Sequence, residues 1–284
     1  MNEKPRHRSG YTAEGTELVR SACLTVAATL GRYLDHIVFV GGVVPSLIID
    51  AQRSPTDEDD EVHPGTNDLD LGLSLALLDE ERYAEISARL RAEGFAPDTN
   101  TAGNATVQRW RLGDLKIDFL IPPVPGQDPR RRVQNLESDF GAIVTPGLEL
   151  AFNERTEIEI DGTTLAGERA RRTVPVCGPG AFVVLKTLAF ADRIVQKDAY
   201  DLVYVVRGMP GGGGAIATRL KEHAVSHPEM IERAITFLDR DFASVDHVGP
   251  RRAAEFEHFE PGARVDAAAD AHGLVDDLLR AYRA

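Results

Sequence analysis

Two aspartates separated by one residue, Asp68 and Asp70, are the pattern in this sequence that most directly predicts chemistry. They stand in the segment Asp68-Leu69-Asp70-Leu71, which alternates between polar and apolar residues as a β-strand does. Because alternate side chains of a strand share a face, the two carboxylates point the same way and the leucines point into the core. Two such carboxylates repel each other unless a cation lies between them. Their hard oxygen atoms favour Mg²⁺ as that cation.

A pair of glycines upstream predicts a place for phosphate groups. Residues 37–40 are a short apolar, β-branched run that stops at Gly41 and Gly42, as a buried strand does before a tight turn. The apolar segment 43–50, which includes Ser46, then predicts a helix. Glycine lets backbone N–H groups approach a ligand, and a helix start adds free donors and a positive dipole end.

The glycine pair, the spacer and the Asp-x-Asp strand together resemble the DNA polymerase β-like nucleotidyltransferase superfamily. More narrowly, they resemble the AbiEii-type nucleotidyltransferases, which are toxins of toxin–antitoxin pairs. The resemblance implies an α+β protein with a nucleotidyltransferase fold: a mixed, mostly antiparallel sheet flanked by helices, followed by a helical C-terminal part. Two departures stand out. The spacer between Gly42 and Asp68 is longer than is usual in the family, and Pro45-Ser46 stands where a small residue is common.

Asp118 is the candidate for a third carboxylate, which this superfamily takes from a later strand of the same sheet. Residues 107–112 and 115–121 alternate around Gly113-Asp114, which predicts a β-hairpin. In its second strand, Asp118 lies on the face opposite to its apolar neighbours. The alternative is that Asp118 lies on the exposed face of an edge strand.

A second pattern lies in segment 179–208, which predicts a long helix because proline is favoured in a first helical turn. In helical phase, Lys186, Arg193, Lys197 and Asp201 share an arc of roughly 80°. Alternatively, Asp198 is the N-cap of a second helix after a break, and the phase does not carry across it.

The order Lys, Ala-x-x-x-Arg, Lys-Asp-x-x-Asp-Leu resembles the segment that follows the catalytic sheet in AbiEii-like enzymes. The matching residues are Lys186, Ala189, Arg193, Lys197, Asp198, Asp201 and Leu202. A structural interpretation competes with the functional one, in which Lys186 and Arg193 are ion-pair partners of Asp198 or Asp201.

The resemblance implies transfer of a nucleoside monophosphate from an NTP, with pyrophosphate as the leaving group. Asp68, Asp70 and Asp118 would then hold Mg²⁺, with two ions expected. Lys186 would neutralise the leaving pyrophosphate, and Asp201 would orient a lysine or the base. The implied nucleotide-binding residues are Gly41, Gly42, Ser46, Thr66, Arg193 and Lys197.

The net charge of −13 disfavours a general nucleic-acid coat protein. It leaves three functions open. The first is a toxin that modifies an RNA, such as a tRNA end. It would use a local basic groove, for which Arg109, Arg111 and residues 130–132 are candidates, and an antitoxin protein would be its partner. The second is an aminoglycoside-type enzyme, whose acidic surface would attract a cationic small molecule. The third is a non-catalytic module that binds a nucleotide or a protein.

The remaining patterns set the organisation of the chain. We expect a catalytic domain over residues 1–176, with extra β-structure over 148–160 and 163–176 around Asp161-Gly162, and a helical domain over 177–284. Helices are expected over 12–33, with Leu18 in the core, and over 78–94, 215–238 and 266–282. Residues 209–214 are expected to be a flexible segment that ends the preceding helix. No structure is predicted for residues 246–264.

Other features indicate the compartment. The polar insertion 52–64 predicts a solvated acidic loop, or alternatively a flap over the nucleotide, with His63 as a loop residue. Cys23 and Cys177 have no nearby metal-binding partners in the sequence, so we expect both to be small buried apolar residues in a reducing compartment. No apolar run is long enough to span a bilayer. We therefore expect a cytoplasmic protein with no membrane contact.

Overall fold

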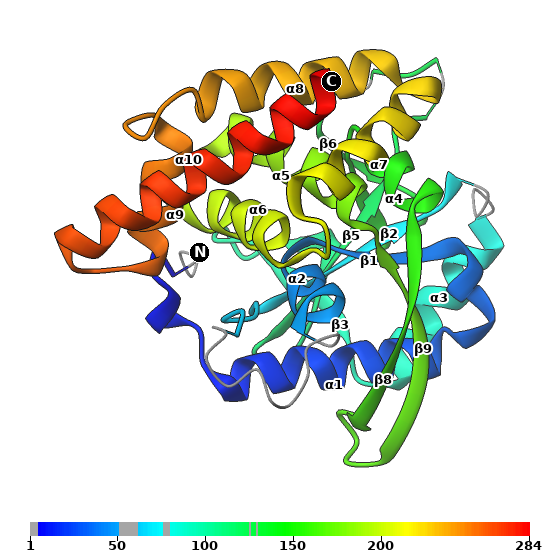
Figure 1. Ribbon diagram of the computed structural model, residues 1–284. Coiled ribbons are helices and arrows are strands. Elements are labelled where there is room, and N and C mark those ends of the chain that lie inside the picture. Colours follow the sequence, from blue (N-terminus) through cyan, green and yellow to red (C-terminus); the bar gives the residue numbers. More distant parts are fainter. Residues whose placement is uncertain (1–4, 51–61, 76–79, 125, 129) are drawn as a thin grey trace. The chain divides into compact units, whose positions relative to one another are not determined.

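The computed structural model describes residues 5–50, 62–75, 80–124, 126–128 and 130–284 (Figure 1). Most of the predicted acidic insertion, residues 52–61, lies outside the described residues. The chain divides into two compact units. The first comprises Thr12–Val44 and Gly65–Cys177. The second comprises Gly178–Ala284 together with the described residues of Lys4–Tyr11 and Pro45–Pro64. These two short segments precede the predicted domain boundary at residue 176.

The first unit is built on a mixed sheet of nine strands within the described residues. The strands are β1 (Ile37–Val40), β2 (Asp68–Leu73), β3 (Ala96–Thr99), β4 (Ala105–Leu112), β5 (Leu115–Ile121), β6 (Arg132–Asn135), β7 (Gly141–Val144), β8 (Arg155–Thr163) and β9 (Arg169–Cys177). Their main order is β3-β4-β5-β2-β1-β9-β8, and β7 pairs with both β5 and β6. Five of the pairings are antiparallel and three are parallel, in keeping with the predicted α+β class.

Helices and short 3-10 turns complete this unit. They are α1 (Ala13–Thr29), η2 (Gly31–His36), η3 (Gly41–Val43), α3 (Glu80–Ala92) and α4 (Leu148–Asn153). The predicted start of α1 and the predicted stop of α3 are confirmed. The predicted end of the first helix at residue 33 is wrong, because α1 ends at Thr29 and η2 follows it. The Thr12 hydroxyl accepts a hydrogen bond from the Gly15 N–H at 3.1 Å, as an N-cap does. Gly94 follows α3 with φ +89°. Leu18 is 38% exposed, so its predicted place in the core is wrong.

One face of the sheet in the first unit carries an aromatic cluster. Trp110, Phe119 and Phe140 contact one another, with ring centroids 4.7–6.4 Å apart, and Tyr83 of α3 stacks on Phe140. Each of these side chains is buried. Leu69, which alternates with the two aspartates of β2, is fully buried too. The alternation predicted from the sequence is therefore present, and it leaves the opposite face for polar residues.

The hairpin β8–β9 extends past the other strands (Figure 1). The predicted turn at Asp161-Gly162 is wrong, because these residues pair inside the strands with Arg171 and Ala170. The chain turns at residues 164–168, where Gly167 has φ +84°. The start of the predicted strand, residues 148–153, is instead the helix α4.

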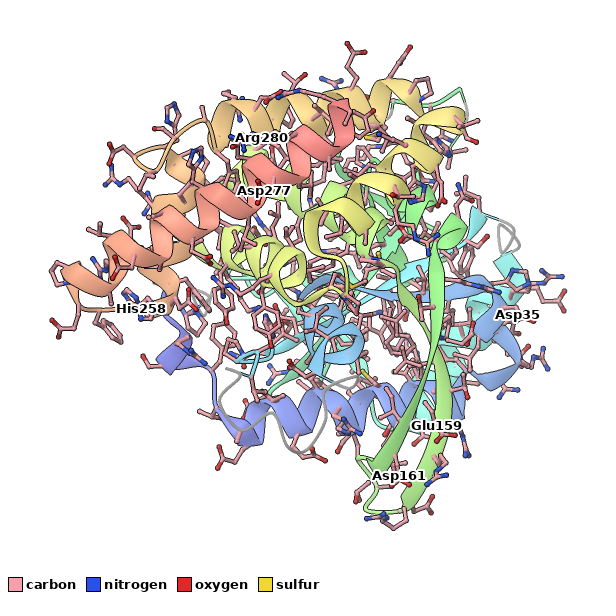
Figure 2. The ribbon with its side chains drawn as sticks, viewed as in Figure 1. Asp35, Glu159, Asp161, His258, Asp277 and Arg280 are labelled. Atoms are coloured by element: carbon pink, nitrogen blue, oxygen red, sulfur yellow. The ribbon has the colours of Figure 1, made fainter. Side chains whose placement is uncertain are left out.

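Cross-strand ion pairs lie along this hairpin. Arg171 lies 3.6 Å from Glu159 and 3.1 Å from Asp161, across the two strands. Figure 2 shows both carboxylates near the far end of the hairpin. Opposite charges on facing strands stabilise the pairing, and a charged edge strand such as β8 resists pairing with other chains.

The second unit is helical. Its helices are α5 (Pro179–Arg193), α6 (Gln196–Gly208), α7 (Gly212–Ser226), α8 (Pro228–Asp241), α9 (Val248–Glu257) and α10 (Pro261–Arg283), and η1 (Arg8–Gly10) precedes them in the chain. The short helix α2 (Val44–Ile48) follows η3 and crosses the boundary between the units in sequence.

Several predicted boundaries in this unit are wrong. The segment 179–208 is two helices, since Ile194 has φ +50° and ends α5. Segment 215–238 is also two helices, separated at His227. The predicted flexible stop at 209–214 overlaps the start of α7, because Gly212 begins that helix. The unassigned region 246–264 contains α9.

Two further observations concern the whole described chain. Cys23 and Cys177 are both free and buried, as predicted. Burial raises the pKa of Cys23 to about 12. None of the described helices combines the length and the apolar character that crossing a membrane requires.

Candidate functional site

Four residues from four neighbouring strands stand in one row across the sheet. Val40 of β1 pairs with Asp70 of β2, Asp70 with Asp118 of β5, and Asp118 with Arg109 of β4. Partners in register on adjacent strands point to the same face of a sheet. The second carboxylate of β2, Asp68, lies two residues from Asp70 and shares that face. The three predicted carboxylates therefore share one face of the central strands.

Asp118 lies inside the sheet. Its strand β5 is flanked by β2 and β4, so the alternative of an exposed edge strand is wrong. The side chain is 10% exposed, and its two oxygens accept two hydrogen bonds from Arg109: Nε lies 2.6 Å from Oδ1, and Nη2 lies 2.5 Å from Oδ2. This two-pronged geometry is the strongest form of a guanidinium–carboxylate contact.

Arg109 is attracted by the whole carboxylate group. Its hydrogen bonds with Asp118 raise the pKa of Arg109 above its usual value, and the charges of Asp118, Asp68 and Asp70 add to that effect although burial opposes it. Arg109 is consequently a permanent cation in the field of all three aspartates.

More cations share this face one row further along. Asp68 pairs in register with Lys116, and Lys116 with Arg111. Arg111 lies 3.7 Å from Asp98 of β3 and also donates to the Gly113 carbonyl. This face therefore carries acidic groups on β2, one acidic and one basic group on β5, and basic groups on β4.

Gly41 lies directly against Asp70. Its backbone has φ +73°, and a Cβ added there would lie 1.9 Å from Oδ2 of Asp70. No side chain fits in that space, and φ in this range favours glycine. The glycine turn that follows β1 therefore makes room for the Asp70 carboxylate. Gly42 is buried beside it.

The other residues predicted from the first motif have separate places. Thr66 is buried, and its hydroxyl accepts a 3.4 Å hydrogen bond from the Asp68 N–H, so it helps to fix the start of β2. Ser46 lies on α2, in a segment that belongs to the second unit. The basic run 130–132 leads into β6, and Arg130 pairs with the nearby Asp128.

The carboxylates of the first unit are the residues that could hold Mg²⁺. Their oxygens are hard donors on one face of adjacent strands, and they already attract a cation, so the donor set fits this ion. Among the described residues, no group of three or more His, Cys, Asp or Glu side chains is arranged as a ready-made metal site.

The second unit contains a buried ion network built on α5 and α6. The Lys186 ammonium lies 2.6 Å from Oδ2 of Asp201 and 3.1 Å from Oδ1 of Asp198. Arg193 donates from Nε and Nη2 to Asp198 at 2.6 and 2.8 Å. Lys197 lies 2.7 Å from Oδ1 of Asp201. The structural interpretation of Lys186 and Arg193 as partners of these aspartates is therefore observed.

The break at Ile194 explains how one network forms from two helices. It ends α5, and Val195 is the N-cap of α6, which places Asp198 in the first turn of α6. Asp198 is therefore not the N-cap that the sequence allowed, although the break itself is present. A carboxylate in a first helical turn is stabilised by the helix dipole.

His63 completes this network and was missed by the sequence reasoning, which made it a loop residue. Its Nε2 lies 2.9 Å from Oδ1 of Asp201, and its ring packs against Tyr200 and Tyr204 with centroids 5.7 and 4.9 Å away. The backbone N–H of His63 also donates a hydrogen bond to the Asp50 carboxylate at 3.2 Å. The only signal in the sequence was a histidine beside an acidic run, which does not indicate a distant partner.

The charged groups of this network hold one another in their ionised forms. Burial opposes ionisation of Asp201, but Lys186 and Lys197 hold the pKa of Asp201 well below its usual value. Burial likewise opposes the charged form of Lys186, yet Asp201 and Asp198 raise its pKa. Burial, joined by the charge of Lys197, lowers the pKa of His63 to about 4. His63 is therefore neutral near pH 7, whereas Lys186, Asp198 and Asp201 are charged.

The predicted site residues thus form two groups. Asp68, Asp70 and Asp118 gather with Gly41 in the first unit, and Lys186, Arg193, Lys197 and Asp201 gather in the second. Each group belongs to a single unit. Comparison with models of known protein families gives no match for this chain. Comparison with curated proteins gives no match either.

Proposed function

We propose that this protein is a Mg²⁺-dependent nucleotidyltransferase, which moves a nucleoside monophosphate from an NTP to an acceptor hydroxyl. The observation that carries the proposal is the row in which Asp70 stands opposite Asp118, with Asp68 on the same face. Three carboxylates so placed are a costly arrangement for a sheet that has no use for a cation. We also propose that the mixed sheet and its helices form a nucleotidyltransferase fold.

The carboxylates have distinct roles in this proposal. Asp68 and Asp70 would hold one ion, and Asp118 together with Asp68 would hold a second. Mg²⁺ would supply charge neutralisation of the triphosphate and activation of the attacking hydroxyl. Gly41 keeps the space above Asp70 free of a side chain, so that the carboxylate keeps its position and backbone N–H groups are accessible to phosphate oxygens.

The cations of the second unit are proposed to bind phosphate groups of a nucleotide. Asp198 and Asp201 hold Lys186, Lys197 and Arg193 close together, and clustered cations suit an anionic ligand such as a phosphate group. Arg193 is the most accessible of the three, with 41% of its side chain exposed. Asp201, which contacts both lysines, would orient them. Ser46 and Thr66 are proposed to contribute to nucleotide binding.

The proposed acceptor is an RNA end, such as the end of a tRNA, in a cytoplasmic toxin–antitoxin pair. The support is local: Arg109, Arg111 and Lys116 share the face that carries the aspartates, and cations beside a reaction centre suit a polyanionic acceptor. The net charge of −13 favours the second candidate, a cationic small molecule of the aminoglycoside kind.

Transfer of label tests the proposal. The purified protein is incubated with each α-³²P-labelled NTP, Mg²⁺ and either total tRNA or a set of aminoglycosides. We expect labelled RNA with the wild type, none with Asp70→Asn, and normal labelling with Asp114→Asn, which removes an equal charge from an exposed turn. Label on an aminoglycoside would select the second candidate. No labelled acceptor of either kind, together with no Mg²⁺-dependent NTP binding, would contradict the proposal.

A further inference from the structure

Arg109 occupies the position that a metal ion needs at the carboxylate face. Its guanidinium holds both oxygens of Asp118, at 2.6 and 2.5 Å. It stands in the same row as Asp70 and Asp118, and the charges of Asp68 and Asp70 act on it as well. Arg109 therefore already offsets part of the negative charge of the three carboxylates.

This arrangement conflicts with direct metal binding. A carboxylate that accepts two N–H bonds from one guanidinium directs its best lone pairs at that group. A divalent ion on Asp118 needs at least one of those oxygens, and it would be repelled by a guanidinium a few ångströms away. Arginine cannot lose its proton to relieve this repulsion. The Arg109 side chain must therefore leave Asp118 when the ion arrives.

The strands allow that exchange. Arg109 has 34% of its side chain exposed whereas Asp118 has 10%, so the arginine is the partner with access to solvent. A guanidinium on a flexible stem can move to other acceptors, while a carboxylate on a central strand cannot.

We propose that Arg109 is the resident counter-ion of the carboxylate face and that it competes with the divalent ion for Asp118. Arg109 thereby sets the metal concentration at which the site fills. This inference rests on the proposed function, because it takes Asp68, Asp70 and Asp118 as the metal ligands.

A direct measurement of metal affinity tests the competition. Mn²⁺ is used as the probe, because its free form is counted by electron paramagnetic resonance and its binding heat by calorimetry, neither of which requires activity. We expect Arg109→Gln to bind Mn²⁺ about tenfold more tightly than the wild type, the worth of one charge-assisted contact. Arg109→Lys, which keeps the charge but loses the two-pronged geometry, should fall between them.

Two controls separate the possible causes. Arg111→Gln removes an equal charge from the same face without touching Asp118, and it should change the affinity less than twofold. Asp70→Asn should abolish the binding. Thermal unfolding checks that each variant is folded; should Arg109→Gln fail to fold, Arg109→Lys alone decides by the sign of its change.

The outcomes distinguish the two proposals. Wild-type binding that Asp70→Asn abolishes and that the Arg109 variants leave equal or weaker would overturn the competition while the metal site stands; the Arg109–Asp118 pair would then be only a strut between β4 and β5. No Mn²⁺ binding by the wild type or by either Arg109 variant would overturn both proposals.

Discussion

Nε2 of His63 lies 2.9 Å from Oδ1 of Asp201, and neither side chain is exposed to solvent. Asp201 is held ionised by its two lysines, so the proton of this hydrogen bond belongs to the histidine. The contact joins the segment just before β2 in sequence to helix α6, and both partners belong to the second unit. It makes the position of Asp201, and through it the positions of Lys186 and Lys197, dependent on a residue from a distant part of the chain.

Replacing this histidine should destabilise the protein. His63→Ala removes a buried donor and leaves a cavity between Tyr200 and Tyr204, so we expect the free energy of unfolding to fall by about 2–4 kcal/mol. His63→Gln, which can donate from its amide, should recover part of the loss. His247→Ala, at an exposed position, should cost less than about 0.5 kcal/mol. Urea unfolding measures all three, and equal losses at positions 63 and 247 would contradict the network.

Stability should also fall with acidification below about pH 6.5. The folded pKa of His63 is about 4, below its ordinary value of 6.5, so between these pH values the unfolded chain binds a proton that the folded chain does not. The contribution is fully present above pH 6.5 and is lost as the pH falls towards 4, by about 1.4 kcal/mol per pH unit.

Urea unfolding at a series of pH values measures this trend, and the same series on His63→Gln isolates the contribution of His63. The variant should show a shallower dependence of unfolding free energy on pH between 6.5 and 4.5. Parallel curves for the two proteins would show that His63 titrates normally in the folded state.

Removal of the Lys186 charge should be more damaging than loss of a surface lysine. Lys186→Met keeps the aliphatic stem but leaves Asp198 and Asp201 with less compensation in a buried setting. We expect a loss of about 3–5 kcal/mol, as for a broken buried ion pair. Lys221→Met, on the exposed face of α7, is the matched control and should be nearly neutral. A loss below about 1 kcal/mol at Lys186 would mean that the network is dispensable for folding.

Gly41→Ala should displace Asp70. The substitution combines a positive φ with a Cβ 1.9 Å from Oδ2, so it should both destabilise the fold and weaken Mn²⁺ binding. Gly103→Ala is the matched control, because Gly103 has φ +80° but nothing within 4 Å of its added Cβ. Both variants should lose about 1–2 kcal/mol from backbone strain. Only the first should lose metal affinity, and equal affinities would refute the placement of Asp70 against Gly41.

Local sequence patterns predicted many of the strands and side-chain faces of the first unit. The alternation in β2 and β5 predicted which faces carry the aspartates and which carry Leu69 and Phe119, since a side-chain period of two follows from strand geometry. The Gly113-Asp114 turn predicted the hairpin of β4 and β5. The order of these strands in the sheet depends on pairing between segments that are distant in sequence. The register of Asp70 with Asp118 therefore could not be predicted from local patterns.

The second unit shows where local patterns fail. Nothing in the residue type of Ile194 predicts φ +50°, because a β-branched residue disfavours it; the surrounding helices impose it. The phase relation of Lys186 with Asp201 therefore could not follow from one continuous helix. The hairpin of β8 and β9 failed in another way, because Asp161 and Gly162 pair inside the strands and the chain turns at residues 164–168 instead.

The most direct test of the central claim is the binding of an NTP analogue with a non-cleavable α,β-linkage, measured by calorimetry with Mg²⁺ and with EDTA. It requires no knowledge of the acceptor. We predict binding that depends on Mg²⁺ in the wild type and in Asp114→Asn, and that is weakened at least about 100-fold in Asp70→Asn, the loss of a metal-bridged phosphate contact. Binding that is unchanged by EDTA or by Asp70→Asn would contradict a nucleotidyltransferase site on this sheet.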